Sequence, residues 1–302
     1  MKVAVMGAGA VGCFYGGLLA RAGASVTLVG RQQHVDAMRQ RGLLLDMGGA
    51  RHSVPVDTTT SASGVADADL VLFCVKSGDT EQVGRETAPY LRPDATVISF
   101  QNGVDNVERL QAVLGRPVVP AAIYVAADMA GPGHVRHNGR GDVVIGPCAR
   151  SEEVLALFAA AGVPARVSAS AIGELWGKLV VNCAYNALSA LTGMAYGRMI
   201  RLPGVEAVMR DVVGECLAVA KASGVELAPD ILDRVLGLAA SMPEQTSSTA
   251  QDLRRGKPTE IDHLNGFVIR KGAELGVPTP ANRVLLTLVK AAEARGQETK
   301  EG

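Results

Sequence analysis

The chain has 302 residues, of which 48% are hydrophobic and 20% are charged, a composition typical of a folded protein with one large domain or two ordinary ones. Its 30 basic and 30 acidic residues give a formal net charge of zero, which argues against binding to nucleic acid or to an anionic membrane surface. No apolar run approaches the roughly 18 residues that a membrane-spanning helix needs, so the sequence predicts a protein outside the membrane.

A strand, a helix and a second strand are predicted at the start of the chain. Lys2–Met6 predicts a short buried strand, and an apolar helix is expected from about Val11 to Ala22. Gly23 ends that helix, and Ser25–Val29 predicts the second strand. The same residues resemble a signal peptide, but its removal would delete the glycine motif that precedes the helix, so we reject that interpretation.

That motif is Gly7-Ala8-Gly9-Ala10-Val11-Gly12, which matches the dinucleotide-binding pattern G-x-G-x-x-G. In this pattern Gly7 allows the tight turn, Gly9 lets a pyrophosphate approach the backbone, and Gly12 lets the helix pack against the strand. The first N–H groups of the helix and its positive dipole end attract the phosphates. We therefore expect contacts to a bound dinucleotide from Gly7, Ala8, Gly9, Ala10, Val11 and Gly12.

Arg31 follows the second strand directly after Gly30. Proteins that prefer NAD usually carry Asp or Glu at this place, where the carboxylate binds the ribose hydroxyls. An arginine would instead attract a 2′-phosphate, so the sequence predicts NADPH/NADP+ as the cofactor. The alternative is a solvated arginine with no ligand.

The rest of the first half alternates strand-like and helix-like segments up to about residue 167. Continuous apolar runs at Asp69–Val75, Thr96–Phe100 and Val163–Val167 are typical of parallel strands that are buried on both faces. The glycine-rich stretch Gly131–Gly139 predicts a hairpin followed by a strand. Helical patterns lie between the runs, at Asp79–Ala88, Val104–Val113 and Ser151–Ala161.

After Ser168 the strand patterns stop and helical periodicity continues to near the end of the chain, with Gly224 and Gly276 as helix stops. We therefore predict an α/β protein in which a Rossmann-type doubly wound sheet (residues 1–168) precedes an all-helical C-terminal domain (residues 169–302). Dehydrogenases with this layout place the active site in the cleft between the two halves. The predicted helices are Ile172–Gly193, Pro203–Ser223, Pro229–Ser241, Pro243–Arg255, Thr259–Leu275 and Ala281–Arg295.

Cysteine and histidine usage predicts neither disulfides nor a metal site. The cysteines are odd in number, scattered and without a C-x-x-C pair, as in a cytoplasmic protein with reduced thiols. His134 and His137 are three residues apart but have no further candidate ligand nearby.

A polar stripe runs along the first predicted helix of the second half. Lys178, Asn182 and Asn186 are spaced four residues apart, which places them on one narrow face of the helix. Most residues between them are apolar, so the stripe must find partners or line a cavity. The alternative is a lysine at a helix edge and two asparagines that bond to neighbouring backbone.

Two polar segments follow buried strands of the first half. Val75-Lys76-Ser77 and Gln101-Asn102-Gly103 each come after an apolar run, which places Lys76 and Asn102 at the carboxyl edge of the sheet, on the cofactor side. Asn102 also has a simpler explanation in the ordinary turn chemistry of Asn-Gly.

A third polar segment, Ser247–Gly266, lies in the helical half. Thr259 predicts a helix N-cap that Asp262 supports. Glu260 would then lie in the first turn, where the helix dipole alone favours a carboxylate.

Taken together, these segments resemble the ketopantoate reductases (2-dehydropantoate 2-reductases) nearly end to end. The resemblance is carried by the glycine motif with Arg31, by Val75–Ser77 and Gln101–Gly103, by the K-x-x-x-N-x-x-x-N pattern of Lys178–Asn186, and by Ser247–Gly266. It implies an oxidoreductase that reduces the ketone of 2-dehydropantoate with NADPH to (R)-pantoate, on the route to pantothenate and coenzyme A.

The resemblance also implies roles for individual residues. Lys178 would protonate the developing alkoxide, which suits a lysine with the ordinary pKa of about 10.4. Asn182 and Asn186 would bind substrate oxygens, Ser248 the carboxylate and Glu260 the substrate hydroxyl. The expected catalytic residues are thus Lys178 and Glu260; the expected cofactor contacts beyond the glycine motif are Arg31, Lys76, Asn102 and Ala126; and the expected substrate contacts are Asn102, Lys178, Asn182, Asn186, Ser248 and Glu260.

Two positions depart from the family pattern and bear on substrate identity. Tyr196 stands where many members carry a further substrate-side asparagine, and Thr249 replaces the usual methionine after the paired serines. The alternatives are a reductase of another 2-oxo acid, an opine-type dehydrogenase and a non-catalytic NADP(H) sensor; intact Lys178 and Glu260 argue against the sensor. The expected partner is a small 2-oxo acid, without nucleic acid or membrane, and a homodimer is left open.

Overall fold

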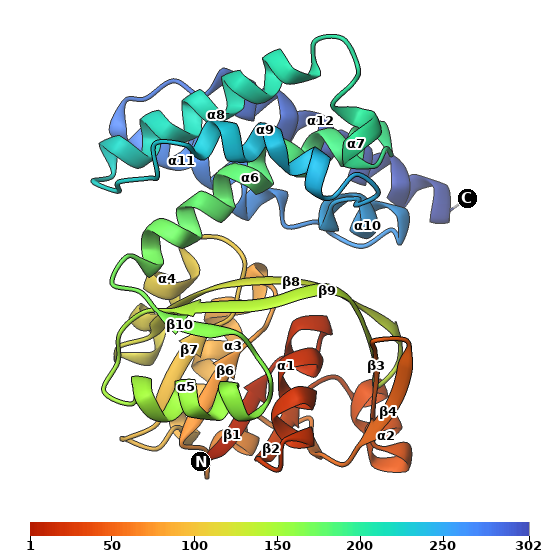
Figure 1. Ribbon diagram of the computed structural model, residues 1–302, viewed down its shortest axis with the longest axis vertical. Helices are drawn as coiled ribbons and strands as arrows, with labels where there is room; N and C mark the ends of the chain where they lie inside the picture. The colour runs from red at the N-terminus through yellow and green to blue at the C-terminus, as the bar shows by residue number, and fades with distance from the viewer. Residues whose placement is uncertain (302) are drawn as a thin grey trace. The chain divides into compact units, whose positions relative to one another are not determined.

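The computed structural model describes residues 1–301 of the chain and the side chains of residues 1–296. The chain divides into two units, Met1–Ile172 and a second unit that begins at Gly173. Each unit has its own architecture and is described by itself (Figure 1). No helix in the part of the chain that the structure describes is long and apolar enough to cross a membrane.

One mixed sheet of ten strands, counted among the described residues, forms the first unit, in the order β4-β3-β9-β8-β7-β6-β1-β2-β5 with β10 paired to β9. Its central strands are short and apolar because helices cover both of their faces. The strands are β1 (Lys2–Met6), β2 (Ser25–Val29), β3 (Leu43–Met47), β4 (Ala50–Val54), β5 (Asp57–Thr59), β6 (Leu70–Phe73), β7 (Thr96–Ser99), β8 (Val119–Gly131), β9 (His134–Ile145) and β10 (Ala165–Val167).

The strands from β5 through β2, β1, β6 and β7 to β8 are all parallel. Taken in chain order they are arranged 3-2-1-4-5-6, the order of dinucleotide-binding doubly wound sheets. The chain moves outward from β1 to β2 and β5 and then returns to β6 on the other side of β1. Ligands of such sheets bind at the carboxyl ends of the strands beside this switch point. The predicted Rossmann-type fold is confirmed.

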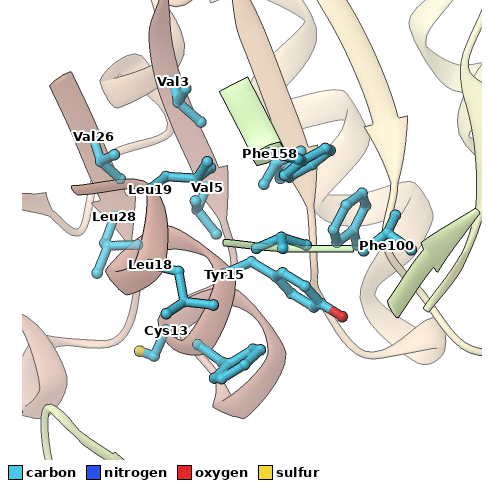
Figure 2. Packing of buried hydrophobic residues seen from close by; sticks show 14 of the residues in the cluster. Val3, Val5, Cys13, Tyr15, Leu18, Leu19, Val26, Leu28, Phe100 and Phe158 are labelled. Atoms are coloured by element: carbon cyan, nitrogen blue, oxygen red, sulfur yellow. The ribbon is translucent and has the colours of Figure 1, made fainter. Parts of the chain in front are cut away.

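Helices cover the two faces of this sheet, and the alternation of side chains along β1 separates the two cores. Val3 and Val5 lie in one core with Tyr15 of α1 (Ala10–Arg21) and Phe158 of α5 (Ser151–Ala160). Figure 2 shows this packing. The other core holds Ala4 and Met6 of β1 together with apolar residues of α3 (Thr80–Thr87) and α4 (Asn106–Leu114).

Several elements of the first unit are absent from the prediction. The segment after Arg31 forms α2 (Gln32–Arg41), the hairpin β3–β4 and the short edge strand β5. The predicted hairpin at Gly131–Gly139 is present, but both of its strands are long, and β9 also pairs with β3 in parallel. Figure 1 shows β8 and β9 as the longest strands of this unit.

The second unit is all-helical over its described residues, as predicted. Its helices begin with the long α6, most of which belongs to this unit. They are α6 (Ala171–Thr192), α7 (Tyr196–Met199), α8 (Val205–Ala222), α9 (Ile231–Ser241), α10 (Ser248–Arg254), α11 (Asn265–Leu275) and α12 (Pro280–Glu301).

The prediction of one helix over Pro243–Arg255 is wrong in its first part, because α10 begins only at Ser248. The backbone carbonyls of Pro243 and Gln245 instead accept hydrogen bonds of 2.9 Å from the N–H groups of Gly197 and Tyr196. These contacts hold the segment before α10 as a loop beside α7, an element that the sequence did not predict.

The prediction of one helix over Thr259–Leu275 is also wrong. A 3₁₀ turn at Ile261–His263 precedes α11, and Leu264 breaks the helix with φ −108° and ψ −99°. Glu260 therefore occupies the N-cap position of a short turn rather than the first turn of a long helix. The Thr259 hydroxyl accepts from the N–H of Ile261 at 3.3 Å, so its capping role applies to that turn.

Candidate active site

The glycine motif occupies the turn between β1 and α1, and its three glycines differ in what surrounds them. Gly7 has φ +108°, and a Cβ there would lie 2.8 Å from the backbone carbonyl carbon of Cys74. A Cβ on Gly12 would lie 2.1 Å from the backbone oxygen of Gly7, so only glycine allows this close packing of helix on turn. A Cβ on Gly9 would meet no atom within 4 Å. The open backbone at Gly9 fits the approach of a pyrophosphate.

The motif is fixed to the end of β2. The N–H groups of Gly7 and Ala8 both donate to the carbonyl oxygen of Val29, at 3.0 and 2.9 Å. Ala8 packs on Gly30, where an added Cβ would lie 2.6 Å from the Ala8 Cβ. Arg31 is the next residue and the N-cap of α2, with an exposed side chain. The structure therefore brings Arg31 beside the glycine motif, while Ala10 and Val11 begin α1 with the N–H groups that a helix start leaves unpaired within the helix.

The segments after β6 and β7 meet at the same carboxyl edge. Lys76 is exposed and precedes a 3₁₀ turn at Ser77–Asp79, and Asn102 is half-buried. The Ser77 hydroxyl donates to the backbone oxygen of Asn102 at 3.2 Å, and the Gln101 amide donates to the backbone oxygen of Val75 at 3.2 Å. The two segments are therefore directly bonded to each other.

Because the chain at Cys74 and Val75 also borders Gly7, the structure groups the glycine motif, Lys76 and Asn102 at one edge of the sheet. Ala126 lies half-buried in β8, opposite Gly139 of β9 and next to a break in the register of the hairpin. The role of Ala126 in binding the cofactor stays a prediction.

In the second unit, α6 carries the polar stripe. Lys178 and Asn182 are half-buried, and Asn186 is buried with 3% of its surface exposed. The other faces of the helix consist of buried apolar residues, such as Leu179, Val180 and Cys183. Burial thus increases along the stripe from the lysine to the second asparagine.

The start of α10 is attached to the buried end of this stripe. The Ser247 hydroxyl caps the helix by accepting from the Ala250 N–H at 3.0 Å, and it donates to the backbone oxygen of Asn186 at 3.1 Å. Ser247 is buried, whereas Ser248 beside it is exposed. Thr249, at the position of the usual methionine, is buried. The two serines therefore have different environments, and only Ser248 is open to a ligand.

The turn that carries Glu260 is fixed on two sides. On one side, the Thr259 N–H donates to Glu293 of α12 at 2.7 Å. Lys290 donates to Asp262 at 2.9 Å, so Asp262 forms an ion pair instead of the expected helix cap. Burial acts to raise the pKa of Glu293, but the hydrogen bonds from Thr259 and Lys290 outweigh it and the pKa is lowered.

On the other side, the Asn265 amide donates to the backbone oxygen of Cys183 on α6 at 3.3 Å, and to the Asn282 side chain at 2.9 Å. Asn282 in turn donates to Glu215 of α8 at 2.7 Å. These three residues support the site and were missed from the sequence. Asn265 lies inside Ser247–Gly266 and could have been identified there, but nothing near Glu215 or Asn282 in the sequence indicates the contact.

Tyr196 is a core residue in this structure. Its ring packs against Tyr185 with centroids 4.5 Å apart, and it is 7% exposed. Burial raises the pKa of its phenol. The Tyr185 hydroxyl donates to the backbone oxygen of Val235 at 2.8 Å, which ties the pair to α9.

Within the described residues, no three histidine, cysteine or acidic side chains are grouped as a metal site would require. The cysteines are free thiols. Burial raises the pKa of Cys13, which follows the glycine motif, to about 12, so this thiol is an inert packing group.

Comparison with known proteins agrees over both halves of the chain. The family model "Ketopantoate reductase PanE/ApbA" matches residues 3–150, and its C-terminal counterpart matches residues 170–293. A 2-dehydropantoate 2-reductase of Pyrococcus horikoshii is 34% identical over 305 residues, which cover 99% of this chain and 100% of the relative.

Solved structures give the same result. A PanE/ApbA family ketopantoate reductase from Ralstonia eutropha has a TM-score of 0.96 and 54% identity, with 98% of this chain and 100% of that chain covered. D-mandelate dehydrogenase with NADH and anilino(oxo)acetate has a TM-score of 0.91 at 24% identity over 98% and 100% of the chains, a likeness that shows the fold alone. With family models matching most of its length, the chain belongs to the ketopantoate reductase family.

Proposed function

We propose that this protein is a 2-dehydropantoate 2-reductase that uses NADPH to reduce the 2-oxo acid to (R)-pantoate. The observation that carries the proposal is the match to relatives of that name over 99% of the chain, at 34% identity. The glycine motif, the Lys178 stripe and Glu260 all lie within the residues that the two family models match. In this proposal residues 1–168 bind NADP(H) and residues 169–302 bind the substrate.

The proposed cofactor site is the carboxyl edge of the parallel strands. The open backbone at Gly9 and the start of α1 would receive the pyrophosphate, and Arg31 would balance the charge of a 2′-phosphate. Lys76, Asn102 and Ala126 would contact the nicotinamide half. When bound, NADPH supplies the hydride that reduces the ketone carbon.

The proposed chemical role of Lys178 is to give a proton to the ketone oxygen as negative charge develops there. A half-buried ammonium stabilises that charge more strongly than one in water, because the effective dielectric constant around it is lower. Asn182 and Asn186 would bind substrate oxygens, Ser248 the carboxylate, and Glu260 would accept a hydrogen bond from the substrate hydroxyl. The buried hydrogen bonds of Ser247 and Asn265 support the proposal, since they keep these groups in place.

The test is a steady-state assay of nicotinamide absorbance with ketopantoate and a panel of other 2-oxo acids. The expected result is a kcat/KM for ketopantoate at least about tenfold above that for acids that lack its hydroxyl, because unpaired polar groups in the site would reject them. Equal turnover of the whole panel would contradict the assignment.

Cofactor preference is tested separately. The wild-type protein should use NADPH in preference to NADH, and Arg31→Ala should lose about 10-fold or more in kcat/KM with NADPH, since a charge-assisted hydrogen bond to phosphate is removed. With NADH the variant should behave like the wild type. Equal use of both cofactors by the wild type would contradict this part of the proposal.

A different 2-oxo acid is the second candidate, and Tyr196 and Thr249 favour it. Both are buried where family members often carry Asn and Met, so the substrate side of the second unit is built differently here. The same panel, repeated with and without amines, also identifies an opine-type reaction, and cofactor binding without any turnover identifies a sensor.

The proposed location is the cytoplasm, in agreement with free thiols. A measurement of the mass in solution tests whether the protein forms a homodimer.

A further inference from the structure

A buried polar cluster lies directly beneath the two segments that carry Lys76 and Asn102. It consists of side chains from the ends of β6 and β7 and the starts of α3 and α4, namely Ser77, Thr80, Gln101, Asn106 and Arg109. Ser77, Thr80, Gln101 and Asn106 are each 4% exposed or less. None of these side chains was assigned a role in the sequence analysis.

Asn106 is at the centre of this cluster, as the first residue of α4. Its amide nitrogen donates to the Ser77 hydroxyl at 3.0 Å and to the backbone oxygen of Asn102 at 2.5 Å. Its amide oxygen lies 2.9 Å from the Thr80 hydroxyl and accepts from Arg109 at 3.2 Å. Both ends of the amide are therefore fully bonded, which fixes its orientation.

The remaining bonds connect the cluster to both chain segments and both helices. Arg109 donates to the backbone oxygen of Ser77 at 2.8 Å and forms an ion pair with Glu81 of α3 at 2.6 Å. Gln101 donates to the Thr80 hydroxyl at 2.7 Å and to the Val75 backbone at 3.2 Å. A buried network in which every side-chain amide donor and acceptor has a hydrogen-bond partner is rigid. Loss of one member leaves other polar groups without a partner in a low dielectric.

We infer that Asn106 is a positioning residue for the nicotinamide half of the cofactor. It touches neither cofactor nor substrate in the proposed site, but it bonds the segment of Lys76 to the segment of Asn102 and so sets the position of both. The inference rests on the proposed cofactor site. The adenine half does not depend on Asn106, because Arg31 and the glycine motif are held by β2 instead.

The test replaces the amide without changing its size. Asn106→Asp keeps an acceptor for Arg109 but cannot donate, when ionised, to the Asn102 backbone oxygen. The Ser77 hydroxyl would then turn to the new carboxylate, so the Asn102 carbonyl loses both of its donors. Thr87→Val is the matched control, because Thr87 is also buried on α3 but bonds only within its own helix, to Val83.

Binding of NADPH and of 2′,5′-ADP, which carries only the adenosine half, is measured by calorimetry. In Asn106→Asp the affinity for NADPH should fall about 10-fold, as expected when a buried hydrogen-bonding group is left unpaired, and that for 2′,5′-ADP should stay within about 2-fold. Thr87→Val should leave both affinities unchanged. Equal losses for the two ligands, no loss for either, or the same loss in Thr87→Val would overturn the inference.

Ser77→Ala provides a second measurement if Asn106→Asp does not fold. This variant removes one of the two hydrogen-bond donors to the Asn102 carbonyl. It should therefore lose less affinity for NADPH than Asn106→Asp does, and again none for 2′,5′-ADP. Equal losses of affinity for the two ligands would overturn the inference here as well. The ratio of the two affinities needs no turnover. A wild-type protein that binds NADPH but does not reduce ketopantoate would therefore disprove the proposed substrate and leave this test intact.

Discussion

Lys178 has the most specific chemical task of the proposed residues, because proton transfer needs its ammonium at one oxygen of the substrate. Lys178→Ala should lower kcat by about 10²- to 10⁴-fold, the range typical of a lost general acid. NADPH binding should change little, since the cofactor contacts proposed here lie on the first unit.

The matched control for this variant is Lys271→Ala, which removes an exposed ammonium that pairs with Glu274 on α11. It should keep full activity, because an exposed pair contributes little to stability and none to the reaction. Near-normal turnover by Lys178→Ala in the same assay would show that another group delivers the proton.

At the scale of residues, the predictable part of the site is the part in which neighbours in sequence are neighbours in space. Gly7, Gly9 and Gly12 could be assigned because one short turn contains them. Glu215 and Asn282 could not, because they meet across 67 positions of sequence. Asn106 likewise bonds to Ser77 across 29 positions, and nothing local distinguishes it from an ordinary helix start.

At the scale of elements, the paired serines at the start of α10 have different environments, and we propose different roles for them. Ser247→Ala removes a helix cap and a buried bond to α6, so it should lower the free energy of unfolding by about 1–2 kcal/mol. Ser248→Ala should leave that free energy unchanged and raise KM for the 2-oxo acid instead. Urea unfolding and steady-state kinetics on both variants check this separation, and a stability loss in Ser248→Ala alone would reverse the assignment.

The hairpin β3–β4 predicts a pH dependence of stability. Asp46 of β3 accepts side-chain hydrogen bonds from Arg51 of β4 at 2.7 Å and lies 2.8 Å from the ring nitrogen of His134 on β9. The pKa of Asp46 is well below its usual range, first because of the Arg51 hydrogen bonds and further because of His134, although burial acts in the opposite direction.

A lowered carboxyl pKa stabilises the folded state at pH values above the unfolded-state pKa of about 3.9, and this contribution disappears as the pH falls through and below that value. Asp46→Asn should therefore lower the thermal midpoint at neutral pH, and the gap to the wild type should close as the pH falls below about 4. Thermal unfolding of both proteins across this range is the measurement. A gap that stays constant down to the lowest pH would mean that the charge of Asp46 is not responsible.

Element boundaries were predictable where local signals decide them and not where tertiary contacts do. The helix α1 and the strands β1 and β2 lie within a residue of their predicted limits, because glycines and a continuous apolar run mark them. The breaks before Ser248 and at Leu264 depend on contacts with α7, α6 and α12, which the periodicity of the segment does not contain. The strand β4 is short, polar and at the sheet edge, so it lacks the apolar run of a central strand. The neighbouring β3 begins with three leucines, Leu43 to Leu45, so its apolar signal was present in the sequence and was missed.

At the scale of the whole molecule, the proposal that the first unit binds the cofactor can be tested without substrate. A ligand that binds only the folded state stabilises it by about 2.7 kcal/mol at a concentration 100 times its Kd. NADPH should therefore raise the unfolding midpoint of the protein, and it should slow amide exchange where the ligand lies. The expected protected segments are the glycine motif, the turn at Ser77–Asp79 and the residues around Asn102.

Amides of α8 and α11 serve as the internal reference in this exchange experiment, because both helices belong to the second unit and carry no proposed cofactor contact. Their exchange should change much less than that of the first unit, and the pattern should be the same with NADP+ as with NADPH. Protection confined to the second unit would contradict the proposed cofactor site, whatever the activity of the protein, because the glycine motif would then have no bound phosphate to shield it.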